Sequence, residues 1–349
     1  MNRYPEAVQT LYAELLDQLL RADAELAVRG LPPGSLVSKE IRGRRYWYLQ
    51  IAAGRDRRQH YLGPDSAALR VWMEQVAAAR RDLEADDRER ARLGAMLGGG
   101  GLPRLPAPVT RVLSILADLG VFRRGGVLVG THAFHALGNV LGVELAEREL
   151  RTQDVDIAQD LSISIALSGE RVDASAALRA ADQRFVPVPG LDLKAAPTSF
   201  RVRGRDLRVD FLTPARSRRD TRPVPIRHLG VAAEPLPFLD YLIEGPIPAV
   251  VLGGQPVLVR VPDPARFALH KLWTAAQRPV TEQVRARKDR RQASALLEVL
   301  AEDRPADLGR AWQGLSRRGE RRQVTRELEA LSDPLRSRVT KELIDEPPY

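Results

Sequence analysis

The stretch GGVLVGTHAFHALGNVLGVELAERELRTQDVDIA, residues 125–158, decides the fold of this chain. Val127–Val129 is a short apolar run behind two glycines, which predicts a strand. Gly130 and Thr131 end that strand, and an apolar, helix-like segment follows them. The alternation in Thr152–Ile157 (TQDVDI) predicts a second strand. We therefore expect a strand, a tight turn, a helix and a further strand in this order.

Two carboxylates share one face of the second predicted strand. Successive side chains of a strand alternate between faces, so Asp154 and Asp156 point one way while Val155 and Ile157 enter a core. Carboxylates about 6–7 Å apart along a strand repel each other unless a cation lies between them. Mg²⁺ or Mn²⁺ is the natural occupant of such an oxygen site. The alternative is a pair at the surface that binds no metal.

The turn between the first strand and the helix has the chemistry of a phosphate site. Gly130 lets the backbone approach a ligand closely. The hydroxyl of Thr131 and the N–H groups of a helix start can donate to phosphate oxygens. The alternative is an ordinary entry into a helix. His132 and His135 lie three residues apart without a third ligand, so we interpret them as core or surface histidines and not as a metal site.

A third carboxylate comes from the segment FRVRGRDLRVDFL, residues 200–212, which predicts a β-hairpin. Asp210 lies between Val209 and Phe211, so its side chain points away from the face that these two bury. Three carboxylates on neighbouring strands can hold two Mg²⁺ ions, one at the phosphates of a nucleotide and one that lowers the pKa of an acceptor hydroxyl. The predicted catalytic and metal-binding residues are Asp154, Asp156 and Asp210.

Composition limits the remaining choices. The chain has 349 residues, enough for two or three domains, and its 44% hydrophobic content allows a substantial core. It contains no cysteine, which excludes disulfides, thiol catalysis and cysteine-based zinc sites. No apolar run reaches the length of a membrane span, and the start of the chain is polar without a signal-peptide pattern. We expect a cytoplasmic protein without membrane contact.

The order of patterns predicts an α+β protein in several parts. Residues 1–97 form a helical region that contains a basic β-hairpin at 34–64. A linker rich in glycine and proline follows at 98–108. We expect the core with the carboxylates at 109–262 and a C-terminal helical domain at 263–349.

Two basic regions have the composition of nucleic-acid-binding surfaces. The net charge is +9, and such an excess points to polyanions only where it is clustered. The hairpin mixes cations with aromatic rings, which suits phosphate contacts and base stacking. Equally, its aromatics can pack on a neighbour and its arginines can be solvated. The second region is a helix around residue 288, either a solvated face or an acceptor surface. The predicted contacts are Arg42, Arg44, Arg45, Tyr46, Tyr48, Arg55, Arg57, Arg58, Arg285 and Arg287.

Five pieces in this order resemble a known family: VLVGTHAF, TQDVDIA, LRVDFLTP, VPDPARFALHKLW and RARKDRRQASALL. Over about residues 109–300 the chain resembles the nucleotidyltransferase fold of the DNA polymerase β superfamily. It is most similar to the bacterial NTP-transferase-like group that includes the AbiEii-type toxins. The resemblance implies that Lys271, Lys288 and Asp289 belong to the nucleotide site. Two departures are the Gly-Thr turn, where many relatives have Gly-Gly or Gly-Ser, and Gln292, where an acid is often found.

The resemblance also implies a fold and a reaction. The fold would be a polymerase-β-like core with a mixed, mostly antiparallel sheet and helices. The residue patterns add an N-terminal helix–hairpin–helix region and a C-terminal helical domain to this core. The reaction would be Mg²⁺-dependent transfer of NMP from an NTP to an acceptor hydroxyl, on RNA such as tRNA, on DNA or on a protein. The alternatives are a non-catalytic nucleic-acid-binding or toxin–antitoxin module with an antitoxin-like partner, and a scaffold role for the N-terminal helices.

Overall fold

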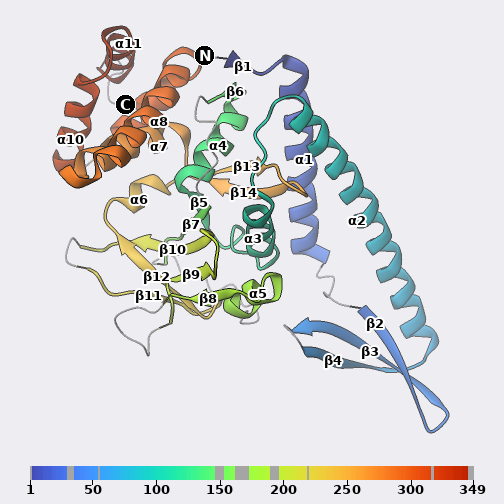
Figure 1. The fold of residues 1–349 in the computed structure, drawn as a ribbon. Helices are drawn as coiled ribbons and strands as arrows, with labels where there is room; N and C mark the ends of the chain where they lie inside the picture. Colours follow the sequence, from blue (N-terminus) through green and yellow to red (C-terminus); the bar gives the residue numbers. More distant parts are fainter. Residues whose placement is uncertain are drawn as a thin grey trace.

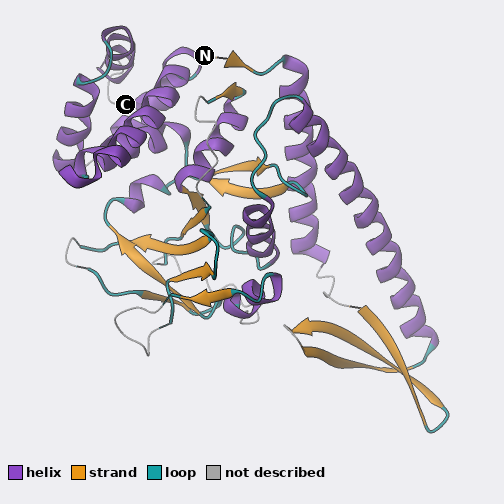
Figure 2. Ribbon diagram, in the orientation of Figure 1, coloured by secondary structure: helices purple, strands orange, loops and turns teal. Residues whose placement is uncertain are grey.

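The structure is a computed structural model with an α+β architecture (Figure 1). It describes residues 2–29, 35–53, 56–145, 153–161, 173–188, 196–217, 220–315 and 318–344. Figure 2 shows two groups of strands set apart by two long helices, with further helices gathered near the C-terminus. In the described part of the chain, we find no helix that combines the length and the apolar character needed to cross a bilayer.

A seven-stranded mixed sheet forms the centre of the molecule. Its main path runs β11-β12-β10-β7-β5, and β9 and β8 extend it beside β10. The pairings β7–β10 and β10–β12 are parallel, and the surrounding pairings are antiparallel. The strands are β5 (Val127–Val129), β7 (Asp154–Ala158), β8 (Phe185–Pro187), β9 (Ser199–Val202), β10 (Arg208–Pro214), β11 (Val224–Ile226) and β12 (Val231–Leu236).

The strand–turn–helix unit predicted from the opening stretch is present. All three residues of β5 are buried, as expected for an apolar run inside a core. Helix α4 (Gly130–Leu141) begins directly after the strand, and Gly142 ends it in the left-handed conformation with a φ of 69°. The predicted hairpin is also confirmed, because β9 pairs antiparallel with β10.

Two long helices form an arm at the N-terminus. Helices α1 (Glu6–Arg29) and α2 (Ala67–Gly99) pack along each other, and a three-stranded antiparallel sheet lies at their far end (Figure 1). That sheet, called here the arm sheet, consists of β2 (Ser35–Ile41), β3 (Arg44–Ala53) and β4 (Asp56–Pro64). The side chain of Ser66 caps α2 by accepting from the N–H of Leu69.

The base of the arm is docked on a second small sheet, β13 (Ile247–Val251) with β14 (Val257–Val261). The buried hydroxyl of Tyr12 accepts from the N–H of Val250 at 3.0 Å, which ties α1 to β13. At the start of the chain β1 (Asn2–Arg3) pairs with β6 (Val143–Glu144). These contacts fix the base of the arm to the rest of the molecule.

The stretch predicted as a linker is more ordered than expected. Helix α2 continues to Gly99, so the first glycines of residues 98–108 are helical. Leu102 and Leu105 are buried, and the N–H of Leu105 donates to the carbonyl of Leu252 at 2.7 Å. The glycines bring the arm close to the core, because the apolar residues that follow them pack immediately.

The C-terminal part is helical, as predicted, and shares one hydrophobic core with the central sheet. Asp263 caps α7 by accepting from two backbone N–H groups. Leu116, Phe211 and Leu297 belong to the same cluster of buried side chains, so the predicted boundary near residue 262 does not divide the core. The other helices are α3 (Ala107–Asp118), α5 (Ala174–Ala181), α6 (Leu239–Leu242), α7 (Pro264–Gln277), η1 (Val280–Glu282), α8 (Gln283–Asp303), α9 (Pro305–Gln313), α10 (Arg318–Glu329) and α11 (Asp333–Ile344).

Candidate functional site

The register of the central sheet brings the three predicted acids together. In the parallel pair β7–β10, Asp156 lies opposite Asp210 and Asp154 lies opposite Arg208. Registered residues on neighbouring strands share a face and lie about 4.8 Å apart. Val155, Val209 and their apolar neighbours are buried on the other face. Three carboxylates from two strands therefore form one acidic patch.

Burial and mutual repulsion raise the pKa values of two of these acids. Burial, followed by the negative charges of Asp210 and Asp154, raises the pKa of Asp156 to about 7. The pKa of Asp154 is also raised, mainly by burial and then by Asp210. Lys271 and Arg208 act in the opposite direction on Asp156, but they do not offset the other effects. Burial and the mutual repulsion of the three acids therefore both favour the protonated form of Asp156.

Gly130 fits tightly against this patch. It has a φ of +71°, which glycine adopts readily and other residues rarely do. A Cβ atom at this position would collide with Oδ2 of Asp156. The start of α4, with its free N–H groups, therefore lies directly beside the carboxylates, and only glycine allows this approach. Thr131 follows at the first turn, and its Oγ1 accepts from Nζ of Lys288 at 3.2 Å.

Lys271 and Asp289 meet in a buried ion pair. Nζ of Lys271 donates to Oδ1 of Asp289 at 2.8 Å, and Nε of Arg278 donates to Oδ2 at 2.9 Å. Asp289 is 3% exposed, so both of its oxygens are used inside the protein. The resemblance placed Asp289 among nucleotide contacts; in this geometry it positions Lys271, which lies close enough to lower the pKa of Asp156.

Arg208 is a site residue that the sequence reasoning missed. Its Nε donates to Oδ1 of Asp210 and to Oγ of Ser199, both at 2.8 Å. It occupies the position opposite Asp154 and is the immediate counter-charge of the patch. The signal was present in the sequence: Arg208 precedes Asp210 by two residues on the same strand, so both side chains point to one face.

Helix α8 adds a basic edge to the site. The charge of Arg285 lowers the pKa of Asp154, although burial keeps that pKa raised overall. The side chain of Arg285 is 68% exposed, and Arg287 is exposed as well. Arg290, on the same helix, binds Glu327 through two hydrogen bonds of 2.6 and 2.8 Å. Arg285, which also pairs with Glu282 at 3.5 Å, is thus the exposed cation of α8 whose charge acts on the acids.

The histidines of α4 are core residues. His132 and His135 are 1% and 5% exposed. Burial lowers the pKa of His132 to about 4, with smaller contributions from His135 and Lys288. His132 is therefore neutral near pH 7. The burial agrees with the interpretation of the two histidines as core residues.

The chemistry of the three acids suits a hard divalent cation, although their side chains do not form a complete coordination site. Among the residues that the structure describes, no group of three or more His, Asp or Glu side chains is already arranged around a metal position. Arg208 holds the carboxylate of Asp210 through an ion pair of 2.8 Å. Carboxylate oxygens are nevertheless the donors that Mg²⁺ and Mn²⁺ prefer. Burial is the largest cause of the raised pKa of Asp156, and the negative charges of Asp210 and Asp154, which a cation would offset, add to it.

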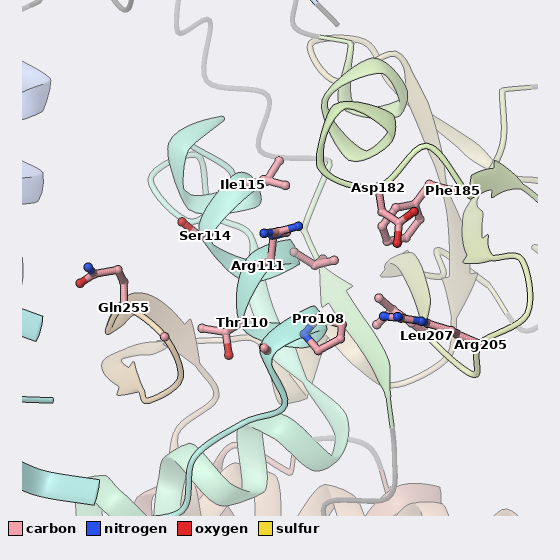
Figure 3. A pocket seen from close by; sticks show the side chains of 13 residues that line it. Pro108, Thr110, Arg111, Ser114, Ile115, Asp182, Phe185, Arg205, Leu207 and Gln255 are labelled. Carbon is pink, nitrogen blue, oxygen red and sulfur yellow. The ribbon is translucent and has the colours of Figure 1, made fainter. Parts of the chain in front are cut away.

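A cavity of about 570 Å³ lies elsewhere, between α3 and the region of α5 and β8 (Figure 3). The charged side chains of Arg111, Asp182 and Arg205 lie around it. Asp182 is already held by Arg184 through hydrogen bonds of 2.7 and 3.0 Å. None of the three acids lines this cavity, so it is not part of the acidic site.

The arm sheet separates the residues that the sequence grouped as one basic surface. Arg44, Tyr46 and Tyr48 alternate along β3 and share a face, whereas Arg45 lies on the opposite face. Arg42 is in the turn between β2 and β3, with a φ of 52°. Arg45 therefore points away from the tyrosines, because side chains of a strand alternate. Arg55, and the side chains of Arg57 and Arg58, lie outside the described residues.

The geometry of the site is typical of proteins that bind nucleotides through their phosphates. A glycine turn at a helix start, beside carboxylates on the next strands, is suited to phosphate chains and cations. The model of a nucleotidyltransferase family matches residues 107–316. The chain belongs to this nucleotidyltransferase family, and the match covers the acidic patch, α4, α7 and α8. No curated protein and no solved structure matches the chain significantly.

Proposed function

We propose that this chain is a metal-dependent nucleotidyltransferase that moves NMP from an NTP to an acceptor hydroxyl and releases pyrophosphate. The observation that carries the proposal is the acidic patch of Asp154, Asp156 and Asp210 directly beside Gly130. Membership of the nucleotidyltransferase family supports NTP transfer in general. The bond formed joins the acceptor oxygen to the α-phosphorus, and the bond broken is the one between the α- and β-phosphates.

The three carboxylates would hold Mg²⁺ or Mn²⁺, and such a cation, when bound, stabilises phosphate charge and lowers the pKa of an acceptor hydroxyl. Asp210 reaches this role by releasing Arg208, whose guanidinium then becomes free to meet a phosphate. A cation bound beside Asp156 would lower the raised pKa of this carboxyl and favour its ionised form.

The nucleotide phosphates fit at the start of α4. The N–H groups after Gly130 and the hydroxyl of Thr131 are donors there. Lys288 already contacts Thr131, so its ammonium lies at the edge of the same turn. Lys271 is held by Asp289 with its charge directed at Asp156. These residues position the phosphates before the reaction, which is the main task in phosphoryl chemistry.

The preferred acceptor is a nucleic acid, RNA or DNA. Arg285 and Arg287 place two exposed positive charges on α8, and Arg285 lies near Asp154. Phosphates of an acceptor strand would bind such cations. A toxin-like reaction on tRNA, checked by an antitoxin-like protein, is one version of this proposal. The alternative is a non-catalytic nucleic-acid-binding or toxin–antitoxin regulatory module, but such a module has no need for three carboxylates crowded on one face of a sheet.

The test is transfer of label from NTPs to total RNA in the presence of Mg²⁺. Asp156→Asn removes one negative charge with little change in shape and is expected to abolish transfer. Asp206→Asn is the matched control, because Asp206 is exposed and close enough to influence Asp154. Equal activity of Asp156→Asn and wild type would contradict the proposal, as would the absence of transfer to any RNA, DNA or protein acceptor.

A further inference from the structure

The arm sheet has one face that the protein uses and one that it leaves to solvent. Its strands lie at the end of α1 and α2, away from the central sheet (Figure 1). In the β2–β3 pairing, Leu36 lies opposite Leu49 and Ser38 opposite Trp47, so these side chains share a face. Leu49 is buried, and Nε1 of Trp47 donates to Asp65 at 3.2 Å.

The same face turns towards the start of α2. Gly63 of β4 lies opposite Trp47 of β3. A Cβ atom built on Gly63 would lie 3.9 Å from Cδ2 of Leu69 in α2. Leu69 is also the residue whose N–H is capped by Ser66. This face is therefore an internal contact, and Arg45 lies on its side of the sheet.

The opposite face, called here the tyrosine face, carries an exposed aromatic cluster. The ring of Tyr61 lies 6.2 Å from that of Tyr46 and 5.5 Å from that of Tyr48, measured between centroids. Tyr61 is 58% exposed. Nζ of Lys39 lies 5.1 Å from the centroid of the Tyr48 ring. Exposed rings of this kind are stabilised further when a flat partner covers them.

The charges on the tyrosine face have one sign. Lys39 lies opposite Tyr46, and Arg44 begins the same row of β3. Glu40 lies opposite Arg45 on the internal face. Among the described side chains whose register places them on the tyrosine face, none is acidic. The face thus combines π-surfaces with positive charge and suits a polyanion that has planar groups.

We infer that the tyrosine face binds single-stranded nucleic acid, with bases stacked on its tyrosines and phosphates at Lys39 and Arg44. Single strands fit better than duplexes, because the bases of a duplex are already stacked on one another and cannot cover protein rings. Charge complementarity favours this occupant over an ordinary protein surface, which would leave two cations without partners. The idea that this face holds the acceptor rests on the proposed transfer function. The idea that it binds single-stranded nucleic acid does not depend on that function.

Binding is tested with the full-length protein and labelled single-stranded RNA, single-stranded DNA and duplexes, by fluorescence anisotropy without NTP. Tyr61→Ala is expected to weaken single-strand binding about tenfold, because base stacking on one aromatic residue contributes about 1–3 kcal/mol. Tyr61→Trp retains a stacking surface and should keep the wild-type affinity. Wild-type protein that prefers duplexes, or that binds no single strand, overturns the inference.

Two neighbouring arginines provide the control for charge. Arg44→Ala and Arg45→Ala remove the same group from adjacent residues on opposite faces of β3. Only Arg44→Ala should weaken binding and reduce the salt dependence, by about one counterion in the slope. Thermal unfolding of both variants checks that each is folded. Equal losses from the two variants overturn the assignment to the tyrosine face.

A transfer assay separates this inference from the proposed function. A trinucleotide acceptor is too short to lie on both the arm sheet and the acidic patch, so Tyr61→Ala should slow transfer to a long single strand and not to a trinucleotide. Equal slowing on both acceptors overturns the acceptor-holding role. If single-strand binding depends on Tyr61 and Arg44 while no acceptor is ever modified, the binding inference stands and the proposed reaction falls.

Discussion

The two main sheets of this protein handle charge in opposite ways. On the central sheet, Asp154, Asp156 and Asp210 are crowded together beside the core, and Arg208 is their nearest counter-charge. On the arm sheet, Lys39, Arg44 and the tyrosines lie on an open face. A fixed, partly buried cluster is suited to chemistry on a small group, because its dipoles and charges are preorganised. An open face suits a long, variable ligand.

The strongest test of this contrast is the loss of Asp210. Asp210→Asn is expected to lower transfer by about 100-fold or more, the scale seen when one preorganised electrostatic group is removed from an active site. Glu234→Gln, on the neighbouring strand β12, should have wild-type activity because Glu234 is exposed and lies outside the patch. Initial rates with a trinucleotide acceptor measure the effect; similar rates for both variants would remove Asp210 from the site.

The next largest effect is expected from the loss of Asp289, the buried partner of Lys271. Asp289→Ala leaves Lys271 and Arg278 without their buried partner, so we expect the free energy of unfolding to fall by about 3 kcal/mol. Glu282→Ala removes a pair with Arg278 nearer the surface and should lower the free energy of unfolding much less than Asp289→Ala. Urea unfolding compares the two. A smaller loss for Asp289→Ala than for Glu282→Ala would show that Asp289 does not organise this region.

Much of the local structure follows from the sequence, and most of the site geometry does not. Alternation placed Asp154, Asp156 and Asp210 correctly relative to their apolar neighbours. The pairing of Asp156 with Asp210 depends on the register of strands more than fifty residues apart, and no local pattern fixes that register. The ion pairs of Asp289 depend on how α7 and α8 pack.

The alternation of side chains along a strand also predicts the faces of Arg208, Arg44 and Arg45, which composition alone does not distinguish. Arg208 lies two residues before Asp210, and the alternation puts both on one face. The alternation also puts Arg44 and Arg45 on opposite faces of β3, although composition alone groups them. The burial of Leu102 and Leu105 could not be predicted from the glycines beside them, because a run of glycines indicates only local flexibility.

A pair of glycines tests how closely the turn must approach the acids. Gly130→Ala should cost about 1–3 kcal/mol of stability and also reduce transfer, because its φ is positive and its Cβ collides with Asp156. Gly125→Ala is the control, since Gly125 has a φ of +88° but open space around a Cβ. It should lose stability from backbone strain and retain transfer. Equal transfer by the two variants would contradict the close-approach interpretation.

The acidic patch also predicts an unusual pH dependence in protein free of divalent metal. Because the folded-state pKa of Asp156 is raised to about 7, the folded protein holds this proton more tightly than the unfolded chain does. The contribution to stability is full below about pH 4 and is lost as the pH rises towards 7. Thermal unfolding in EDTA measures this slope, and Asp156→Asn should remove it. Added Mg²⁺ should stabilise the protein most above pH 7.

The smallest effect on stability is expected at the arm sheet. Arg44→Ala and Tyr61→Ala change exposed side chains, so each should alter the free energy of unfolding by at most about 0.5 kcal/mol. Their losses should appear in single-strand binding alone. Chemical denaturation monitored by circular dichroism checks this, and a loss comparable to that of Asp289→Ala would mean that the tyrosine face is structural.

The most direct test of the acidic patch is a crystal structure with Mg²⁺ and a non-hydrolysable NTP. We expect a metal ion about 2.0–2.1 Å from oxygens of Asp154 and Asp156. The phosphates should lie at the start of α4, and Arg208 should have released Asp210. A nucleotide bound elsewhere, for instance in the cavity beside α3, with the ion pair of Arg208 and Asp210 intact, would contradict the account.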